Sequence, residues 1–348
     1  MQNLEYFDTG IFMLFCSILI SIILCWISLK VAPKINLMDD PKTADHKKHK
    51  KPTPITGGLV LIDTILFLML FTGLWSNENI FAIIISSFII AGLGILDDYL
   101  NLEPLQKLLG QIFGSVLLIY NGVQINLFNS PEFFFSLSPD IANLLNISFT
   151  IFWLLAITNA FNFIDSIDGL TIGISGVSTL FFFIISLTTG QVELFLFCSI
   201  LLGICVGIYF FNSHPAKLFL GDSGAQTLGF ILASIAIIYN PSKGFQSSSW
   251  FLPILIFYMP LFDLILVVLS RIKRKQKIYK ASRDHTFHRL SDHNISVSHS
   301  VLIIHGISLV MSMIGYLCLN LSILNANIIF ILTIMIGALA FIKLDKNY

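Results

Sequence analysis

The sequence contains few charged residues. Only 11% of its 348 residues are Asp, Glu, Lys or Arg and 55% are hydrophobic, whereas a soluble domain contains about 25% charged residues. The 20 basic and 20 acidic residues cancel, so no bulk charge points to a nucleic-acid partner. The scarcity of charge, together with long apolar runs, excludes an ordinary soluble protein. It predicts an all-α, polytopic integral membrane protein.

The sequence also lacks several features that would point to other classes of protein. Its cysteines have no CxxC or Cys/His spacing, which predicts reduced, packed thiols rather than a disulfide or metal framework. We find no repeat of two homologous halves, which many transporters have, and no appended soluble domain. The first apolar run lacks a basic n-region and a cleavage site, so we expect a retained span. The prediction is one integral membrane domain over residues 1–348.

Hydropathy predicts eleven membrane-spanning helices, each close to the ~20 residues that cross ~30 Å of hydrocarbon. Nineteen of the 20 Lys and Arg residues then fall on one side, and only Lys243 falls on the other. The positive-inside rule makes the basic side cytoplasmic, with the N-terminus outside and the C-terminus inside. The predicted spans are 10–32, 56–75, 80–96, 105–121, 143–161, 169–189, 192–211, 224–240, 250–270, 298–319 and 326–343. The predicted cytoplasmic segments are about 33–55, 97–104, 162–168, 212–223 and 271–297.

Five aspartates lie where apolar runs end, all on the predicted cytoplasmic side. Asp97 and Asp98 are adjacent in GILDDYL, Asp165 and Asp168 occur in NFIDSIDGL, and Asp222 occurs in FLGDSGAQ. Adjacent carboxylates repel each other unless a cation separates them, so this pattern suits a divalent cation and a polyanionic substrate. The simpler alternative is a set of hydrated helix ends, with Asp222 capping the helix that follows it.

Amide side chains accompany the acidic residues. Asn159, Asn162, Asp165 and Asp168 recur every three residues, which places them on one face of a helix. A polar stripe among Phe, Ile and Leu is costly in lipid. The stripe therefore favours a functional site over a hydrated helix junction.

Basic groups flank the acidic segments. Lys107 opens the fourth predicted span and either contacts a phosphate or snorkels to the membrane surface. His285 and His288, with Arg283 and Arg289 beside them, suit a clamp for a diphosphate, although basic segments next to a membrane are also topology signals. No set of Cys or carboxylate residues accompanies these histidines at the spacing of a zinc site, so we do not expect one here.

Three further residues have open interpretations. His49 lies in a Lys- and His-rich loop, which forms either one wall of an anion pocket or an ordinary positive-inside loop. Asp63 and Asp263 lie within the second and ninth predicted spans, where an ionisable group is by default a functional candidate.

The ordered set of motifs resembles one family, the polyprenyl-phosphate N-acetylhexosamine-1-phosphate transferases, which includes the WecA, TagO and MraY types. The resemblance extends from about residue 39 to residue 290. It implies a catalytic role for Asp97, Asp98, Lys107, Asp165, Asp168 and His285. It implies substrate binding by His49, Asn162, Asn212, Arg283, His288 and Arg289. It implies a metal site at Asp222 with Asp98 and Asn162.

The resemblance also implies a reaction and its reactants. A hexosamine 1-phosphate would move from a UDP-sugar to a polyprenyl phosphate such as undecaprenyl phosphate, with release of UMP. Mg²⁺ would assist, with Mn²⁺ as a substitute. The setting would be a bacterial plasma membrane and the start of an envelope glycan, such as O-antigen or teichoic acid. The implied partners are donor, acceptor and membrane lipids, and a homodimer is compatible with this picture.

One position separates the branches of this family. Phe287 stands where the resemblance leads us to expect a histidine, which argues against the peptidoglycan substrate of the MraY type. The sequence is therefore closer to the WecA and O-antigen-initiating type. The MraY-type reaction stays the first alternative. A secondary transporter is the alternative from another class.

Overall fold

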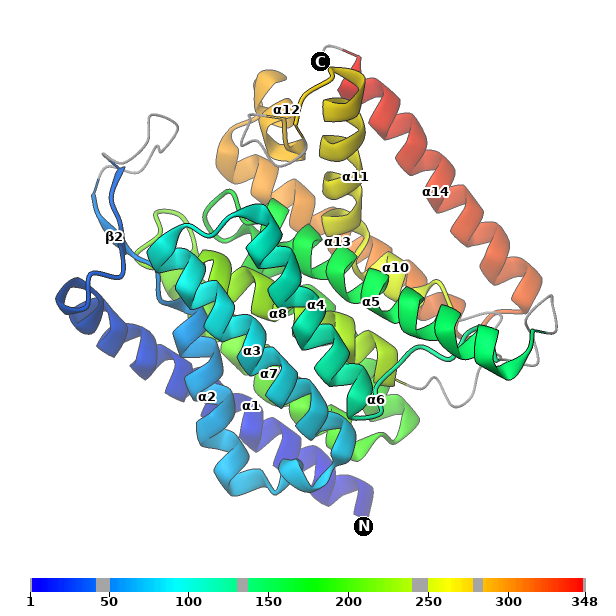
Figure 1. Ribbon diagram of the computed structural model, residues 1–348, viewed down its shortest axis with the longest axis horizontal. Coiled ribbons are helices and arrows are strands. Elements are labelled where there is room, and N and C mark those ends of the chain that lie inside the picture. Colours follow the sequence, from blue (N-terminus) through cyan, green and yellow to red (C-terminus); the bar gives the residue numbers. More distant parts are fainter. Residues whose placement is uncertain (1, 42–50, 130–136, 240–249, 278–283, 347–348) are drawn as a thin grey trace.

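A computed structural model describes residues 2–41, 51–129, 137–239, 250–277 and 284–346 (Figure 1). The helices are α1 (Gln2–Val31), α2 (Gly57–Thr72), α3 (Glu78–Leu100), α4 (Pro104–Tyr120), α5 (Pro139–Ile164), α6 (Leu170–Thr189), α7 (Val192–Asn212), α8 (Gly221–Ile238), α10 (Leu252–Ile256), α11 (Tyr258–Lys273), α12 (Thr286–Asp292), α13 (Val297–Cys318) and α14 (Ile323–Asp345). Short 3₁₀ helices occur at Ala32–Lys34 and Leu74–Ser76. Strands β1 (Met38–Asp39) and β2 (Thr53–Pro54) pair antiparallel, with Met38 opposite Pro54.

The chain is an all-α, polytopic membrane protein, as its composition predicts. Eight helices within the described ranges are long and apolar enough to cross a membrane, namely α1, α3, α5, α6, α7, α8, α13 and α14. The other three predicted spans fall on α2 with 16 residues, on α4 with 17 residues and on the pair α10 and α11. The five cysteines are free thiols, and four of them are buried, as predicted.

The ninth predicted span is not one continuous helix. It breaks at Phe257, between the end of α10 at Ile256 and the start of α11 at Tyr258. Pro260 explains the break, because a proline ring lacks an N–H group and clashes with the carbonyl four residues earlier, here that of Ile256. The hydroxyl of Ser178 in α6 donates to this carbonyl at 3.4 Å. The neighbouring helix thus satisfies the group that the break leaves free.

Helix α8 forms the centre of the molecule and packs against α2, α3, α5 and α6 (Figure 1). Almost all of its residues are buried, from Ser223 to Ala236. Helix α1 lies against α7, where Ser17 and Ser21 face Gly203 and Gly207. Lipid gives membrane helices little hydrophobic reason to associate, so small residues at these contacts allow the close packing that holds them together.

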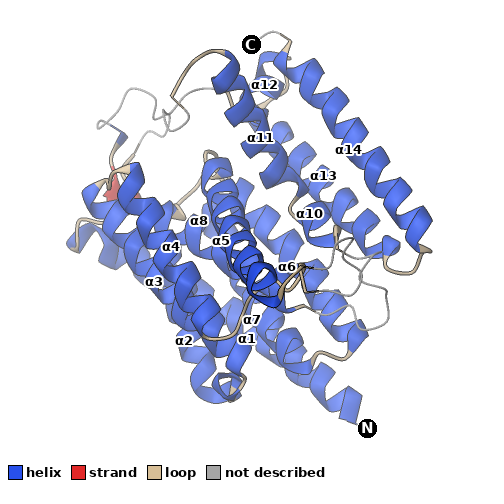
Figure 2. Cartoon of the chain, turned by 45° about the vertical axis from the view of Figure 1, so that its right-hand side comes forward, coloured by secondary structure: helices blue, strands red, loops and turns tan. Residues whose placement is uncertain are grey.

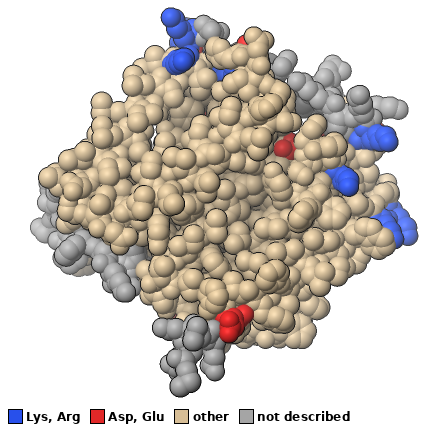
Figure 3. Space-filling model, turned by 180° about the vertical axis from the view of Figure 1, so that it is seen from behind, with Lys and Arg blue, Asp and Glu red and all other residues tan. Residues whose placement is uncertain are grey.

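Many large apolar side chains are exposed on the outer surface. Figure 3 shows a broad face nearly free of charge, with Lys and Arg gathered at its upper and right-hand edges. Phe67 and Leu70 of α2 are exposed on the surface, as lipid-facing side chains would be. Asp63 is exposed on the same helix. Asp263, the other deep acid, is instead buried.

The C-terminal helix is tied to α11 and α12 at the end where the chain terminates (Figure 2). Buried Arg289 of α12 donates to the Leu344 carbonyl at 3.1 Å and to Asp345 Oδ1 at 2.9 Å. Lys273 of α11 donates to the other carboxylate oxygen of Asp345 at 2.8 Å. These contacts fix α12, which begins directly after His285, against two longer helices.

Candidate active site

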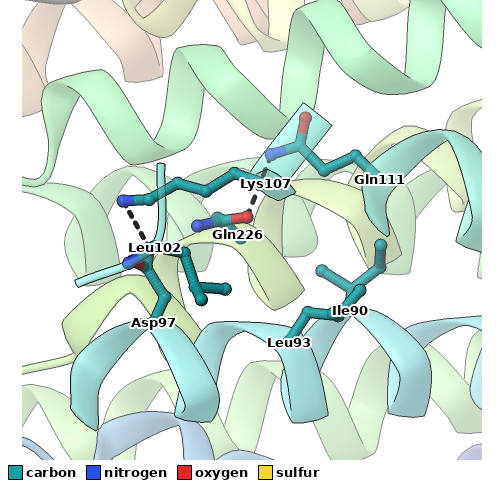
Figure 4. Close-up of a pocket in the computed structure, with 7 residues that line it drawn as sticks. All are labelled: Ile90, Leu93, Asp97, Leu102, Lys107, Gln111 and Gln226. Carbon is teal, nitrogen blue, oxygen red and sulfur yellow. Dashed lines mark hydrogen bonds and ion pairs between the residues drawn. The ribbon is translucent and has the colours of Figure 1, made fainter. Parts of the chain in front are cut away.

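Lys107 joins two aspartates from distant parts of the chain. Its Nζ atom donates to Asp222 Oδ2 of α8 at 2.7 Å and forms an ion pair with Asp97 Oδ2 of α3. Figure 4 shows the lysine side chain directed toward Asp97. Asp97 is buried, and its Oδ1 atom accepts from the Leu102 backbone N–H at 2.8 Å. The ends of α3, α4 and α8 therefore meet at one cation shared between two carboxylates.

Asp98 caps the N-terminus of α8. Its two oxygens accept the backbone N–H groups of Asp222 at 2.8 Å and Ser223 at 3.2 Å. These N–H groups have no partner within their own helix, and the positive end of a helix dipole favours a carboxylate. Asp98 thus holds Asp222 in place from the neighbouring helix. Its direct binding of a metal stays a prediction.

Glycines bring α2 and α3 against the start of α8. A Cβ atom on Gly94 would lie 2.3 Å from the Ser223 Cα, and one on Gly58 would lie 2.4 Å from the Ser223 Oγ. The backbone N–H of Gly58 also donates to the Leu220 carbonyl at 3.2 Å. Gly94 is not among the residues that the sequence motifs predicted to be functional. The GLG spacing of residues 92–94, just before the two aspartates, was the available signal.

A second group of contacts holds the loops after α5 and α7 together. Asp168 Oδ2 lies 2.9 Å from His214 Nδ1 and accepts the Ala216 backbone N–H at 3.1 Å. Asn212 accepts the Gly169 N–H at 3.1 Å and donates to the Leu218 carbonyl at 2.9 Å. Asn212, predicted to bind substrate, is buried and ties the two loops to each other.

Asp165 and Asn162 border the ion-pair group. The Asn162 side chain hydrogen-bonds to Asp222. The pKa of Asp165 is raised from 3.8 to about 7, chiefly by burial and also by the charges of nearby aspartates, against the opposing effect of a hydrogen bond with Thr171. Asp165 therefore lies in a strongly negative part of the site, where a bound cation would lower its pKa.

His285 is oriented by Asp263. The Asp263 carboxylate lies 2.8 Å from His285 Nδ1 and accepts the Thr286 backbone N–H at 2.6 Å. The His285 ring lies 6.4 Å from the Phe163 ring, which follows Asn162 in the chain. This contact brings the last predicted segment to the edge of the site.

The remaining predicted residues differ in their placement. His288 lies against Phe287, with ring centroids 3.9 Å apart. Arg289 is buried in its ion pair with Asp345, so the geometry does not support the predicted contact with substrate. His49 and Arg283 lie outside the described residues.

The donor atoms fit a hard divalent cation. No group of three or more His, Cys, Asp or Glu side chains in the described part of the chain is arranged to hold a metal. Two carboxylates nevertheless converge on one cation, and the amide of Asn162 adjoins Asp222. Mg²⁺ is usually bound by one or two carboxylates together with substrate phosphates and water. Asp97, Asp222 and Asn162 would supply the protein ligands of such a site, and the binding of Mg²⁺ stays a prediction.

Comparison with known proteins agrees with this geometry. Residues 80–240 match the family model described as glycosyl transferase family 4. The chain is 31% identical over 325 residues to a probable undecaprenyl-phosphate N-acetylglucosaminyl 1-phosphate transferase of Bacillus subtilis. This match covers 93% of this chain and 89% of the relative. The chain belongs to glycosyl transferase family 4. The matched region includes α3, α4, α5 and α8 and hence Lys107 and both aspartates that it joins.

Other relatives in the family are named for a different activity. Phospho-N-acetylmuramoyl-pentapeptide-transferases of Clostridium acetobutylicum and Enterococcus hirae are 29% and 32% identical to this chain. These matches cover 81% and 68% of this chain, and 88% and 75% of the relatives.

The close contact at Gly94 leads to a first prediction. Gly94→Ala should destabilise the protein by about 1–3 kcal/mol, because the added methyl group meets backbone rather than a movable side chain. Gly92→Ala, on the same helix and with nothing within 4 Å of its Cβ position, is the matched control. Thermal unfolding in detergent measures both, and equal midpoints for the two variants would contradict the packing described here.

The raised pKa of Asp165 leads to a second prediction. Between pH 4 and pH 7 the unfolded chain ionises this carboxyl group while the folded protein keeps it protonated. In metal-free buffer the wild type should therefore lose stability as the pH rises through this range, and the loss should level off above about pH 7. Asp165→Asn should lose less stability than the wild type over this range, because only the other carboxyl groups of the site still ionise, so its unfolding midpoint should exceed that of the wild type most at pH 8. Asp140→Asn, at the exposed opposite end of α5, is the control, and parallel pH curves for Asp165→Asn and wild type would refute the assignment.

Proposed function

We propose that this protein transfers an N-acetylhexosamine 1-phosphate from a UDP-sugar to polyprenyl phosphate, releasing UMP. The single observation that carries the proposal is the Lys107 ion pair with Asp97 and Asp222, built at the ends of membrane helices. The B. subtilis relative that covers most of this chain is named for such a transfer to undecaprenyl phosphate. The product would be the first lipid-linked intermediate of an envelope glycan, such as O-antigen or teichoic acid.

The chemistry requires that negative charge be neutralised. A phosphate monoester has a second pKa of about 6, so the acceptor is mostly dianionic at neutral pH and needs no strong base. Its oxygen would attack the sugar-bearing phosphorus, the bond between that phosphorus and the bridging oxygen of the diphosphate would break, and UMP would leave with the bridging oxygen. Repulsion between the two anions dominates the barrier, so fixed positive charge is the main contribution expected of the protein.

Each residue of the site would make a different contribution to charge neutralisation or to positioning. The Lys107 ammonium, held at the junction of three helices, would neutralise phosphate oxygens. Asp222, Asn162 and Asp97 would hold Mg²⁺, which would screen the charge of the donor diphosphate. His285 would direct its Nε2 atom at a substrate oxygen, because Asp263 engages its Nδ1 atom. Asp98 and Asp168 would act by fixing the backbone around these groups.

The placement suits one water-soluble and one lipid substrate. The Lys and Arg bias supports a site on the cytoplasmic side, and the membrane would be a bacterial plasma membrane. There a nucleotide sugar can arrive from water while the polyprenyl chain stays in lipid. Neither substrate then has to cross the bilayer before the reaction.

The muramoyl-pentapeptide reaction is the second candidate, because several relatives at similar sequence identity are named for it. The N-acetylglucosaminyl relative matches a larger share of this chain, 93% against 81% and 68%. Phe287, where the resemblance leads us to expect a histidine, also favours the first candidate. The two reactions differ only in the donor, so the donor is what an experiment must vary.

The central test is UMP release by purified protein supplied with UDP-N-acetylglucosamine, polyprenyl phosphate and Mg²⁺. Asp222→Ala should lower the rate by about 100-fold or more, since it removes both a metal ligand and a partner of Lys107. Asp140→Ala should leave the rate unchanged. Chelation of the metal should stop the reaction, and full activity of Asp222→Ala would remove this residue from the site.

A donor panel tests the specificity. UDP-N-acetylglucosamine, its C4 epimer, a 6-deoxy analogue and the UDP-muramoyl-pentapeptide would each be supplied with the same acceptor. We expect release of UMP from one of the first three donors and little from the last. Release from the pentapeptide donor alone would establish the second candidate.

The direct attack can be tested without the acceptor. If the lipid phosphate attacks the donor itself, labelled UMP should not exchange into UDP-sugar when the acceptor is absent. Rapid exchange under these conditions would instead indicate a covalent sugar-phosphate intermediate on the protein.

A further inference from the structure

A group of three amide side chains lies directly beneath the charged site. Gln111 of α4 donates through Nε2 to Gln226 Oε1 of α8 at 2.9 Å, and Asn159 of α5 donates through Nδ2 to Gln111 Oε1 at 2.7 Å. Gln111 and Gln226 are each only 3% exposed. We call these three residues the amide layer.

Each amide lies one helical turn from a residue of the site. Gln111 follows Lys107 by four positions, Gln226 follows Asp222 by four, and Asn159 precedes Asn162 by three. Residues at these spacings share one face of a helix. Helix α5 ends at the site, whereas α4 and α8 begin there. All three amides therefore lie further from these helix ends than the charged residues do. Figure 4 shows the two levels together, with Lys107 directed at Asp97 and Gln111 directed at Gln226.

Stability alone does not explain this arrangement. Replacing mutually hydrogen-bonded amides by apolar groups of similar shape is often nearly neutral, whereas leaving one of them unpaired costs about 1–3 kcal/mol. The hydrogen bonds add a constraint on how far each helix can slide along its axis relative to its neighbours, that is, on their register. A helix that slides by one residue moves by about 1.5 Å, and apolar packing against lipid-like neighbours resists such shifts weakly. Single buried polar groups are known to fix the register of packed helices.

We propose that Gln111, Gln226 and Asn159 are positioning residues for the transfer reaction. They set the register of α4, α8 and α5, so that the Lys107 ammonium lies between Asp97 and Asp222 and Asn162 reaches Asp222. The inference rests on the proposed function, because the register matters for the rate only if these residues act on substrate. None of the three amides touches the reacting atoms in this role.

The test separates register from stability. The triple variant Gln111→Met/Gln226→Met/Asn159→Leu removes the whole layer at similar volume and leaves no amide of the layer unpaired. We expect an unfolding midpoint close to that of the wild type, a kcat about 100-fold lower, and a KM for the UDP-sugar that changes far less, because displacement of catalytic groups by about 1 Å has effects of this size. Gln226→Met alone should be less stable than the triple variant, since it leaves Gln111 without that partner. A stable triple variant with wild-type kcat would overturn the proposal.

A matched control and a milder variant complete the test. Asn146→Leu removes a buried amide at the far end of α5, where it accepts the Phe128 N–H at 3.0 Å. It should lower stability without changing kcat per folded molecule. Asn159→Leu alone, at a half-buried position, serves if the triple variant does not fold. It should lower kcat with little change in KM, and an unchanged kcat per folded molecule would overturn the proposal.

A second readout does not depend on activity. Lys107 should react slowly with an amine-directed reagent, because its Nζ atom is engaged by both Asp97 and Asp222. Peptide mass spectrometry should show faster labelling of Lys107 in the triple variant than in wild type, and equal rates would overturn the proposal. If wild-type protein releases no UMP from any donor, the proposed function fails, while this labelling still tests whether the layer sets the register.

Discussion

The ion pair of Lys107 with Asp97 and Asp222 is the interaction on which the rest of the site depends. Three charged groups at the rim of an apolar helix bundle are stable only when they compensate one another, because each is costly to bury alone. Lys107 and Asp222 are 115 residues apart in the chain. Close backbone packing at Gly58 and Gly94 and the cap formed by Asp98 are what bring them within reach.

The site is organised in levels along the helices that form it. Charged groups lie at the helix ends, where phosphates and water can reach them. Amides lie one turn deeper, where hydrogen bonds are strong and ions would be costly. Below these, α8 itself contributes buried apolar side chains such as Leu228 and Ile231. This order lets a protein with few charged residues place most of its chemistry at one end of its helices.

Charge in the C-terminal part serves the fold instead. Arg289 was expected to clamp a diphosphate, yet its guanidinium group is buried against Asp345 and the end of α14. Asp263, which the sequence singled out only as a deep acid, orients His285. An arginine that binds substrate and one that pairs with a distant helix have the same local sequence. Only the position of α14 distinguishes them.

The sequence by itself determined the class, the approximate helix positions and the motifs that carry the chemistry, because hydropathy and the types of polar residue are local properties. It did not reveal the break at Phe257, since the cost of Pro260 depends on whether a neighbour such as Ser178 can satisfy the freed carbonyl. Only the tertiary structure showed that the two adjacent aspartates have different partners, since Asp98 caps α8 while Asp97 pairs with Lys107. Adjacent residues on a helix point in directions about 100° apart, so their partners depend on which helices pack on each side, and that is decided by contacts between distant segments.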